Sequence, residues 1–447
     1  MTLRRSIAVL LVTCGAARAG GFDLPARGVR SLARGGAFVA GADDADGLWQ
    51  NPAGLAHLAG DGVRALLFDV AFLYQDAAHV RTDASGAPFA TVTNRQPGRL
   101  VPTLAGAIGI GKRLVIAGGL TAPYAPVHDY AADGPQRYAG VSTNGSQTVM
   151  VTVGAAFVVD ERLRIGASIG NVYTKTSARI VASACPGAMA CGTEDPNLDA
   201  VVGIEQTDAL APTATLGVQY QILPRVTVGL VAQAPWRVSA RGTMSLALPR
   251  GGPFLDATVT GTTAELSWTH PPSLRAGVEL RPSDRWRVEG AFGAELWSLH
   301  DGTTIAPDNV GVTGPNLGTI AVAPMKIPSN ARTSFSSALA VEWHGPSVML
   351  GAGVAVETGA FPAGEVTVRA LDARKWLIGA GGGWEAAGWQ IGGSVGLVAL
   401  ADVTVSDAEA RAPLLQPLRD PVVPSAVNAG TYRASYLLAG IRFARRW

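Results

Sequence analysis

Two cysteines in the segment ACPGAMACG, Cys185 and Cys191, are close enough in sequence to react with each other. An even, closely spaced pair in an exported chain predicts a disulfide-bonded loop. A metal site is not expected at this place, because no histidine lies nearby in the sequence. The cysteines therefore predict a covalent link within a loop, provided that other features of the chain indicate export.

Acid–base catalysis is a second kind of chemistry to consider, because the chain has six histidines. His128 lies beside Asp129, and this is the arrangement closest to a catalytic pair. No serine stands in a nucleophile motif such as G-x-S-x-G. The other histidines are dispersed along the chain, at His57, His79, His270, His300 and His344. A hydrolase is therefore the weakest of the interpretations considered below.

Charged side chains also occur inside otherwise apolar stretches, where an unpaired charge is costly. The set comprises Asp69, Arg275, Glu279, Arg287, Glu289, Glu295 and Arg442. Most of these side chains are expected to pair with one another. An arginine can instead hold a carboxylate through paired hydrogen bonds. Arg275, Arg287 and Arg442 are the candidates for such a role, and the sequence does not choose among them.

The beginning of the chain indicates export. Arg4 and Arg5 precede an apolar run at residues 7–13, and Ala17-Arg18-Ala19 forms a small-x-small cleavage site. The apolar run is too short to span a membrane, so residues 1–19 are expected to be a cleaved signal peptide. An oxidising compartment follows from this, which agrees with the disulfide.

The composition is unusual for a soluble exported enzyme. The chain of 447 residues is 48% apolar and only 16% charged, and its mean hydropathy is positive, +0.22. Beyond the signal, no apolar run reaches the length of a transmembrane helix. A chain that is apolar on average but never continuously so suggests alternation. The net charge of +2 gives no reason to expect a nucleic-acid partner.

Alternation of apolar and other side chains begins near residue 63, in VRALLFDVAFLYQD. Every second residue is apolar, and the residues between them are of mixed character. The apolar parity is Leu66, Phe68, Val70, Phe72 and Tyr74. Successive side chains of a strand point to opposite faces, so the pattern predicts a strand with one apolar face. Fourteen segments show this pattern: 63–76, 100–110, 114–122, 147–159, 163–176, 213–221, 226–236, 264–281, 286–299, 332–343, 348–357, 375–384, 389–400 and 431–443.

The connections between these segments alternate between short turns and long loops. Together with the even strand number, this predicts an all-β, fourteen-stranded antiparallel transmembrane β-barrel of the outer-membrane type. A closed barrel also leaves no unpaired strand edge in lipid. A large secreted β-sandwich is the soluble alternative, but it predicts no such asymmetry in loop length.

Tryptophans also favour a barrel, because indoles collect at membrane interfaces. Four lie at the short-turn ends of strands, namely Trp286, Trp343, Trp384 and Trp389. Four others lie near the long-loop ends, namely Trp236, Trp268, Trp297 and Trp376. We therefore expect two aromatic girdles. The terminal strand YLLAGIRFARRW ends in an aromatic residue, which is typical of the signal for the barrel-insertion machinery.

The segment before the first strand resembles a known family. GGFDLPARGVRSLARGGAFVAGADDADGLWQNPAGLAHL resembles the N-terminal hatch of the FadL family of outer-membrane channels for long-chain fatty acids and other hydrophobic compounds. Asn51-Pro52-Ala53 is its strongest element. Similarity continues in APY at residues 122–124, in PPSLRAGVELRPSDRWRVEGAFGAELWS and in LDARKWLIGAGGGW. It extends over nearly the whole chain.

The resemblance implies a hatch at residues 20–60 inside a barrel formed by residues 61–447. It also implies passive uptake without cofactors, with a lumenal binding site beside the hatch and sideways exit into the bilayer. Phe22 is then an apolar wall of that site, and Asn51, Pro52 and Ala53 hold a turn that either gates the lumen or only packs the hatch.

Lateral exit is placed near the third strand, whose end reads GGLTAPYAP. Gly118 and Gly119 have no side chains to pack, and Pro123 has no backbone N–H to donate to a neighbouring strand. The strand pairing is therefore expected to weaken there. The expected partners are a hydrophobic small molecule and membrane lipid, and the expected state is a monomer. A general diffusion porin is the main alternative, and an outer-membrane lipid hydrolase is a weaker one.

Overall fold

The computed structural model describes residues 28–96, 98–123, 127–187, 189–192 and 194–447. The expected signal peptide at residues 1–19 and Phe22 lie outside these described residues. Within them, no helix is long and apolar enough to cross a membrane.

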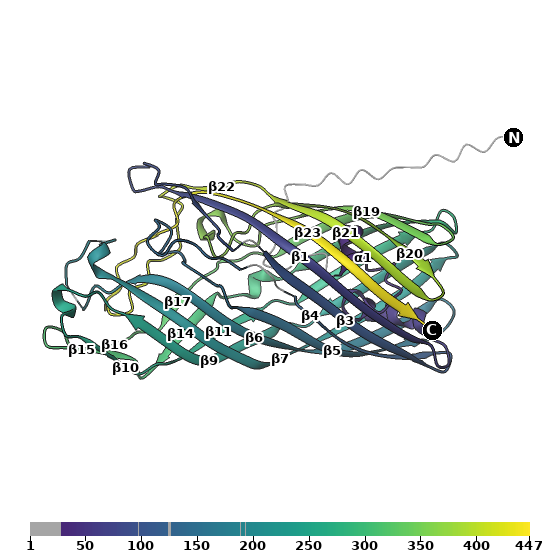
Figure 1. Cartoon of the computed structure of the whole chain (residues 1–447), viewed down its shortest axis with the longest axis horizontal. Coiled ribbons are helices and arrows are strands. Elements are labelled where there is room, and N and C mark those ends of the chain that lie inside the picture. The colour runs from purple at the N-terminus through teal and green to yellow at the C-terminus, as the bar shows by residue number, and fades with distance from the viewer. Residues whose placement is uncertain (1–27, 97, 124–126, 188, 193) are drawn as a thin grey trace.

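A closed, strongly tilted β-barrel dominates the structure (Figure 1). Twelve of its strands run without interruption: β1 (Arg64–Arg81), β3 (Gly98–Ile110), β4 (Leu114–Thr121), β5 (Gln147–Val158), β6 (Leu163–Ser183), β7 (Asp199–Leu223), β13 (Trp286–Glu295), β18 (Ser334–His344), β19 (Val348–Glu357), β20 (Lys375–Ala386), β21 (Trp389–Leu400) and β23 (Gly430–Arg446). Two more are each interrupted once: β8 (Val226–Gln233) continues into β9 (Trp236–Ala247), and β11 (Thr263–His270) continues into β12 (Ser273–Leu280). Neighbours are antiparallel, and β1 pairs with both β3 and β23. The fourteen-stranded antiparallel barrel is therefore confirmed.

Short elements occupy the N-terminal segment and the long-loop end. The N-terminal segment contains α1 (Val29–Ala33), α2 (Gly47–Gln50) and the 3-10 helix η1 (Pro52–Leu58). The loops contain β2 (Val92–Thr93), η2 (Pro196–Leu198), η3 (Gly252–Phe254), β10 (Thr258–Thr260), η4 (Trp297–Leu299), β14 (Thr303–Asp308), β15 (Gly311–Gly314), β16 (Gly318–Ala321), β17 (Met325–Ile327), η5 (Ala363–Glu365) and β22 (Val403–Val405). Strands β10, β15 and β16 form a small separate sheet.

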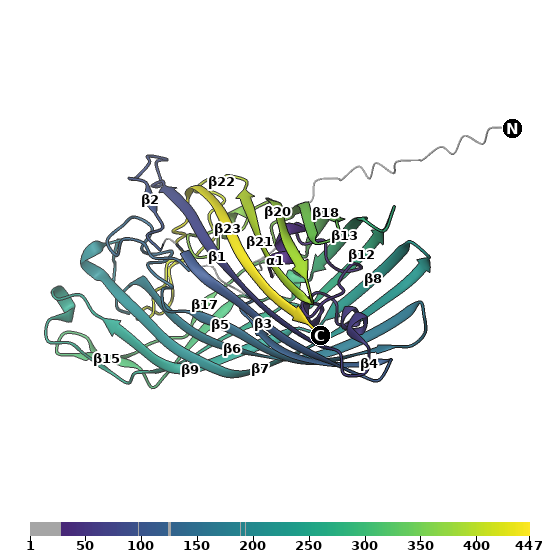
Figure 2. The same cartoon turned by 45° about the vertical axis from the view of Figure 1, so that its right-hand side comes forward.

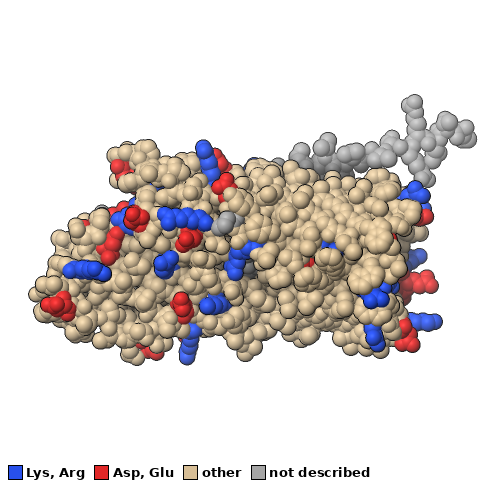
Figure 3. Space-filling view, in the orientation of Figure 1, with Lys and Arg blue, Asp and Glu red and all other residues tan. Residues whose placement is uncertain are grey.

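The expected alternation of faces is present in the barrel wall. In β1, Leu66, Phe68 and Phe72 are exposed on the outside, whereas Leu67 and Leu73 are buried inside. Figure 3 shows the result on one face of the barrel, as a broad band with almost no charged side chains between charged ends. An apolar outer band is what a transmembrane barrel presents to lipid.

Several strands extend farther toward the long loops than the sequence pattern suggested. Strand β6 ends at Ser183 instead of residue 176, and β7 begins at Asp199 instead of residue 213. The exposed side chains of these extensions are mixed, with Arg179 and Glu205 beside the apolar Val201 and Leu210. The strict apolar alternation is therefore lost in these parts, although the strand pairing continues.

The prediction of two tryptophan girdles is correct at the short-turn end of the barrel and partly wrong at the long-loop end. Trp286, Trp384 and Trp389 are about half exposed on the outside. Trp236 and Trp297 are instead 2% and 1% exposed, inside the barrel. Trp236 stacks on a histidine ring, and Trp297 donates to a carboxylate, so both have interior partners that local sequence does not reveal.

The N-terminal segment, residues 28–60, lies within the barrel (Figure 2). Helix α1 packs on β19, β20, β21, β23 and β1, whereas η1 packs on the adjoining strands β3 to β7. The segment therefore touches the wall around most of its circumference.

Candidate functional site

A carboxylate on β13 anchors the N-terminal segment through its backbone. Glu289 is fully buried and accepts hydrogen bonds from the backbone N–H groups of Val39 (2.7 Å), Ala40 (2.8 Å) and Gly41 (2.9 Å). It also accepts from the guanidinium of Arg34 at 2.6 Å. Four donors around one carboxylate fix the position of this loop against the wall, because charge-assisted hydrogen bonds are the strong ones.

Two arginines of α1 and its C-cap connect the segment to the wall by ion pairs. Arg30 makes a two-point contact with Glu342 of β18, at 2.9 and 3.0 Å, and contacts Asp43 at 2.6 Å. Arg34 reaches the same Glu342 at 2.5 Å. Arg287 of β13 reaches Asp43 from the opposite direction at 2.5 Å. These buried charges are paired both within the segment and across to the barrel.

A third anchor lies where the last strand meets the first. Arg442 of β23 contacts Asp69 of β1 from Nε at 2.9 Å and from Nη2 at 3.0 Å. Its Nη1 donates to Asp44 of the segment at 3.0 Å. Asp69 in turn accepts from the backbone N–H of Val29 at 2.8 Å. Closure of the barrel and attachment of the segment therefore share one pair of side chains.

Asn51 organises the turn that precedes η1. Its side-chain oxygen accepts from the backbone N–H of Ala53 at 3.1 Å, and its amide nitrogen donates to Val39 O at 2.9 Å. Pro52 follows as the first residue of η1. Gly217 of β7 allows this approach, because an added Cβ would overlap the Asn51 side chain and Pro52. The expected turn is present, and it packs directly on the wall.

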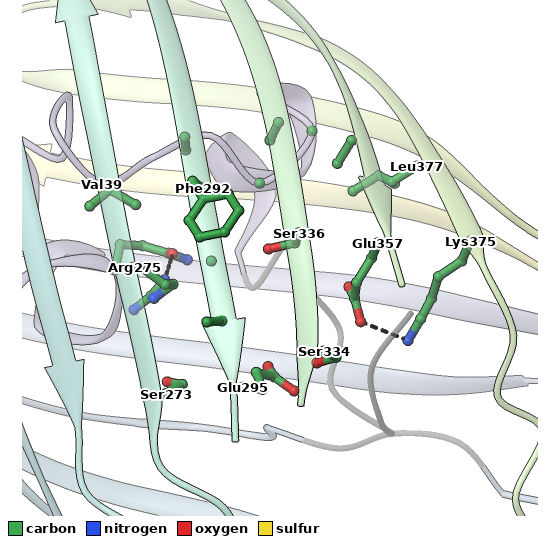
Figure 4. Close-up of a pocket in the computed structure, with 18 of the residues that line it drawn as sticks. Val39, Ser273, Arg275, Phe292, Glu295, Ser334, Ser336, Glu357, Lys375 and Leu377 are labelled. Atoms are coloured by element: carbon green, nitrogen blue, oxygen red, sulfur yellow. Dashed lines mark hydrogen bonds and ion pairs between the residues drawn. The ribbon is translucent and has the colours of Figure 1, made fainter. Parts of the chain in front are cut away.

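A cavity of about 80 Å³ lies between the segment and the wall formed by β12, β13 and β18 to β21 (Figure 4). Val39 and Leu377 contribute apolar surface. Arg275 donates to the Trp49 carbonyl at 2.9 Å and to Gln50 at 3.3 Å. The lining of the cavity is therefore mixed, with apolar surface beside several polar and charged side chains.

The far side of this cavity carries an ion pair, Lys375 with Glu357 at 3.0 Å. Glu295 also lines it and accepts from the indole of Trp297 at 2.7 Å. Sequence reasoning singled out Glu295 but missed Lys375 and Glu357. Both sit at strand ends beside long loops, where alternation does not show which face points inward.

Of the three arginines proposed from sequence as ligand-binding residues, only Arg275 lines this cavity. Arg287 and Arg442 are instead bound to acidic residues of the N-terminal segment. The segment supplies Asp43, Asp44 and Asp46 as these partners. The role of Arg287 and Arg442 in ligand binding therefore stays a prediction.

The wall has a break in pairing at the end of β4. Thr121 is the last residue of β4 and pairs with Thr103 of β3 and Met150 of β5. Among the described residues, 98–102 of β3 and 147–149 of β5 have no strand between them. A side chain spans the break, since Arg99 donates to the Ser146 carbonyl at 2.6 Å.

The sequence placed this weakening too early along the strand. Gly118 and Gly119 are regularly paired on both sides. Gly119 has a packing role instead, because an added Cβ would meet the Trp49 ring. Pairing stops after Thr121, just before Pro123, which is buried and lies outside the ladder.

Comparison with known proteins identifies the architecture. The family model described as "Outer membrane protein transport protein (OMPP1/FadL/TodX)" matches residues 10–426, which is most of the chain. The chain belongs to the FadL/TodX family. It is therefore an integral protein of the outer membrane. No curated protein sequence matches the chain significantly.

Solved structures of the FadL/TodX family share the fold at low sequence identity. A FadL homologue of Pseudomonas aeruginosa is 16% identical with a TM-score of 0.76, and the match covers 95% of this chain and 99% of that chain. The toluene transporter TodX of Pseudomonas putida is 15% identical with a TM-score of 0.65, covering 95% and 99%. The CymD monoaromatic hydrocarbon channel is 16% identical with a TM-score of 0.61, covering 96% and 99%.

The other residues singled out for chemistry in this FadL/TodX family member are its cysteines and histidines. Cys185 and Cys191 form a disulfide in the loop between β6 and β7, with their Cα atoms 6.1 Å apart. Among the described residues, no three His, Cys, Asp or Glu side chains are grouped as metal ligands would be. His128 points to Gln75 (3.1 Å), not to the adjacent Asp129.

Proposed function

We propose that this protein is a passive outer-membrane channel for hydrophobic small molecules, such as long-chain fatty acids or monoaromatic hydrocarbons. Ligand is bound in the lumen beside residues 28–60, which act as a hatch, and leaves sideways into the bilayer. The observation that carries the proposal is the coexistence of a cavity with a partly apolar lining beside the segment and a break in the wall after Thr121. The family's transport role and the toluene transporters among its solved structures support it.

The many anchors of the N-terminal segment support its role as a hatch. Buried ion pairs and backbone hydrogen bonds attach it to β1, β13, β18 and β23. A general diffusion porin needs an open aqueous lumen, and a segment that packs along most of the inner wall works against this.

Lateral exit is favoured by the energetics of an apolar ligand. An alkyl chain gains about 0.8 kcal/mol for each methylene that leaves water. A route through the wall avoids returning the ligand to water in the periplasm. The break after Thr121 is the place where the wall offers such a route, since no ladder has to be broken there.

A reversible thiol bridge across this break tests the route. Arg99→Cys and Ser146→Cys, joined by a short bis-methanethiosulfonate linker, replace the natural contact across it. We expect uptake of labelled hexadecanoate or toluene into cells to fall severalfold and to recover on reduction, while binding to purified protein persists. Wild-type protein treated identically is the control, because reduction also opens the Cys185–Cys191 bond. Unchanged uptake with the bridge formed would reject lateral exit.

Two further features remain part of the proposal. We expect the protein to act as a monomer, and its C-terminal strand to be recognised by the barrel-insertion machinery. Sedimentation of the purified protein in a density-matched detergent measures the first. Deletion of Trp447, which should lower the amount of folded protein in the outer membrane, measures the second.

A further inference from the structure

Arg445 is an exposed cation on the lipid-facing side of the barrel, at the short-turn end where the C-terminus lies (Figure 1). It pairs with Leu66 of β1, whose side chain is exposed on the outside. Its guanidinium lies 4.7 Å from the ring centre of Trp389 and 5.3 Å from that of Trp447. In the described part of the chain, no carboxylate forms an ion pair with Arg445. Two indoles therefore orient a charge that no acidic side chain neutralises, and we call these three side chains the cation–π cluster.

Arg64 adds a second positive charge beside the cation–π cluster. It begins β1 and exchanges two backbone hydrogen bonds with Trp447, at 2.9 and 3.0 Å. Residues that are directly opposite in an antiparallel pair point to the same face, so Arg64 shares the outer face with Trp447. Its side chain is exposed, and none of the described carboxylates forms an ion pair with it. Two arginines thus adjoin one indole at the level where a barrel meets the membrane interface.

An open groove of about 640 Å³ lies farther along the same outer face, toward the middle of the barrel. Small residues of β20, β21 and β23 line it, including Ala380, Gly393 and Ala439. Larger side chains border it, such as Phe72 and Ile441, which are about half exposed. The groove has the volume of a pocket that binds a drug-sized molecule, and its lining is almost entirely apolar.

The spacing between the cation–π cluster and the groove fits one acyl chain of a phospholipid. Arg445 and Ala439 are six residues apart on β23. This separation is about 20 Å along a strand, and about 15 Å along the barrel axis at a strand tilt of about 40°. One leaflet contributes half of the hydrocarbon core, which is also about 15 Å. A lipid whose headgroup lies at the cluster therefore has its acyl chains at the depth of the groove.

We propose that the outer face of β20, β21, β23 and β1 binds one glycerophospholipid of the periplasm-facing leaflet. Its phosphate lies at Arg445 and Arg64, and one of its acyl chains lies in the groove. Guanidinium groups suit this role, because their planar array of donors matches phosphate oxygens. The inference does not depend on the proposed function, since this face of the wall points away from the lumen.

Two lipids that differ in the phosphate headgroup test this inference. Purified protein, stripped of lipid in detergent micelles, is titrated with dioleoylphosphatidylglycerol or dioleoylglycerol, and bound lipid is counted by native mass spectrometry. Arg445→Gln should weaken phosphatidylglycerol binding about fivefold, as expected for one arginine at an anionic lipid surface, and change dioleoylglycerol binding less than about twofold. Arg433→Gln is the matched control and should change neither affinity, because Arg433 lies on the same strand at the long-loop end and pairs with Asp402.

Two further variants keep the test decisive if Arg445→Gln does not insert. Trp389→Leu removes one ring of the cation–π cluster and leaves the C-terminal strand unchanged, and should weaken phosphatidylglycerol selectively by about threefold. Ala439→Phe fills the groove and should weaken both lipids to a similar extent. Equal effects of Arg445→Gln and Arg433→Gln, or equal binding of the two lipids by the wild-type protein, would overturn the inference. Unchanged binding in Ala439→Phe would overturn the assignment of the groove to an acyl chain.

Discussion

The guanidinium of Arg442, on the last strand, donates to the carboxylate of Asp69, on the first strand, at 2.9 Å. Both side chains are almost fully buried inside the barrel. The same pair also holds the N-terminal segment, through Asp44 and through the backbone of Val29. The Arg442–Asp69 interaction therefore links the two strands that close the barrel and also attaches the N-terminal segment to them.

Removal of this arginine should destabilise the protein strongly. Arg442→Gln leaves buried carboxylates without a counter-charge, and breaking a buried ion pair in this way costs about 3–5 kcal/mol. We expect a decrease of that size in the free energy of unfolding, measured by guanidinium titration in detergent micelles. Arg433→Gln removes an exposed pair instead and should cost less than about 1 kcal/mol. Equal effects of the two variants would contradict the central role of Arg442.

Loss of the Glu289 carboxylate should loosen the hatch. Glu289→Gln removes the charge that accepts from three consecutive backbone N–H groups and from Arg34. We expect a nearly silent channel to show frequent openings in planar-bilayer recordings. Glu385→Gln, at an exposed position near the end of β20, is the control and should stay silent. Silence in both variants would mean that this anchor does not hold the hatch closed.

A methyl group on β7 should displace the Asn51-Pro52 turn. Gly217→Ala places a Cβ where the Asn51 side chain and Pro52 lie. We expect the hatch to become accessible to trypsin at Arg30 and Arg34, as detected by mass spectrometry of the digested barrel. Gly290→Ala adds the same methyl where no atom lies within 4 Å, and should leave the hatch resistant. Resistance in Gly217→Ala would show that the turn tolerates a shift of the wall.

Acidification should release the part of the hatch that contains His57. Burial lowers the pKa of His57 to about 4, against the opposing charge of Asp43, and the ring contacts Gln219 at 3.2 Å. In the folded hatch the pKa of His57 is lower than its ordinary value near 6.5. The stability contributed by the neutral ring is therefore fully present above pH 6.5 and is lost as the pH falls toward 4.

Hydrogen exchange of residues 47–58 measures this effect. Exchange should be faster at pH 5 than at pH 7 after correction for the intrinsic rates. His57→Gln should remove the excess, since it cannot be protonated. An identical acid response in His57→Gln would assign the effect to other groups.

Sequence patterns predicted the strands of the barrel wall better than the contacts made inside the lumen. Alternation in β1 identified both faces, because lipid on one side imposes apolar residues at every second position. This pattern is lost toward the long loops, where β6 and β7 continue with mixed outer faces. It also does not reveal the inner partners, since Glu342, for example, pairs with Arg30, which lies 312 positions away in the sequence. Arg442 was recognised as an inward charge, but only the structure shows Asp44 at its side.

The Arg442–Asp69 contact joins residues 373 positions apart in the chain. Contacts between such distant residues form late, because the intervening chain must first be ordered. During export the N-terminal segment emerges first, yet the site that receives Val29 and Asp44 is complete only when the final strand has arrived. During assembly of this barrel, the charged N-terminal segment therefore has to remain without these contacts until the last strand is in place. The strand that closes the wall also fixes the position of that segment.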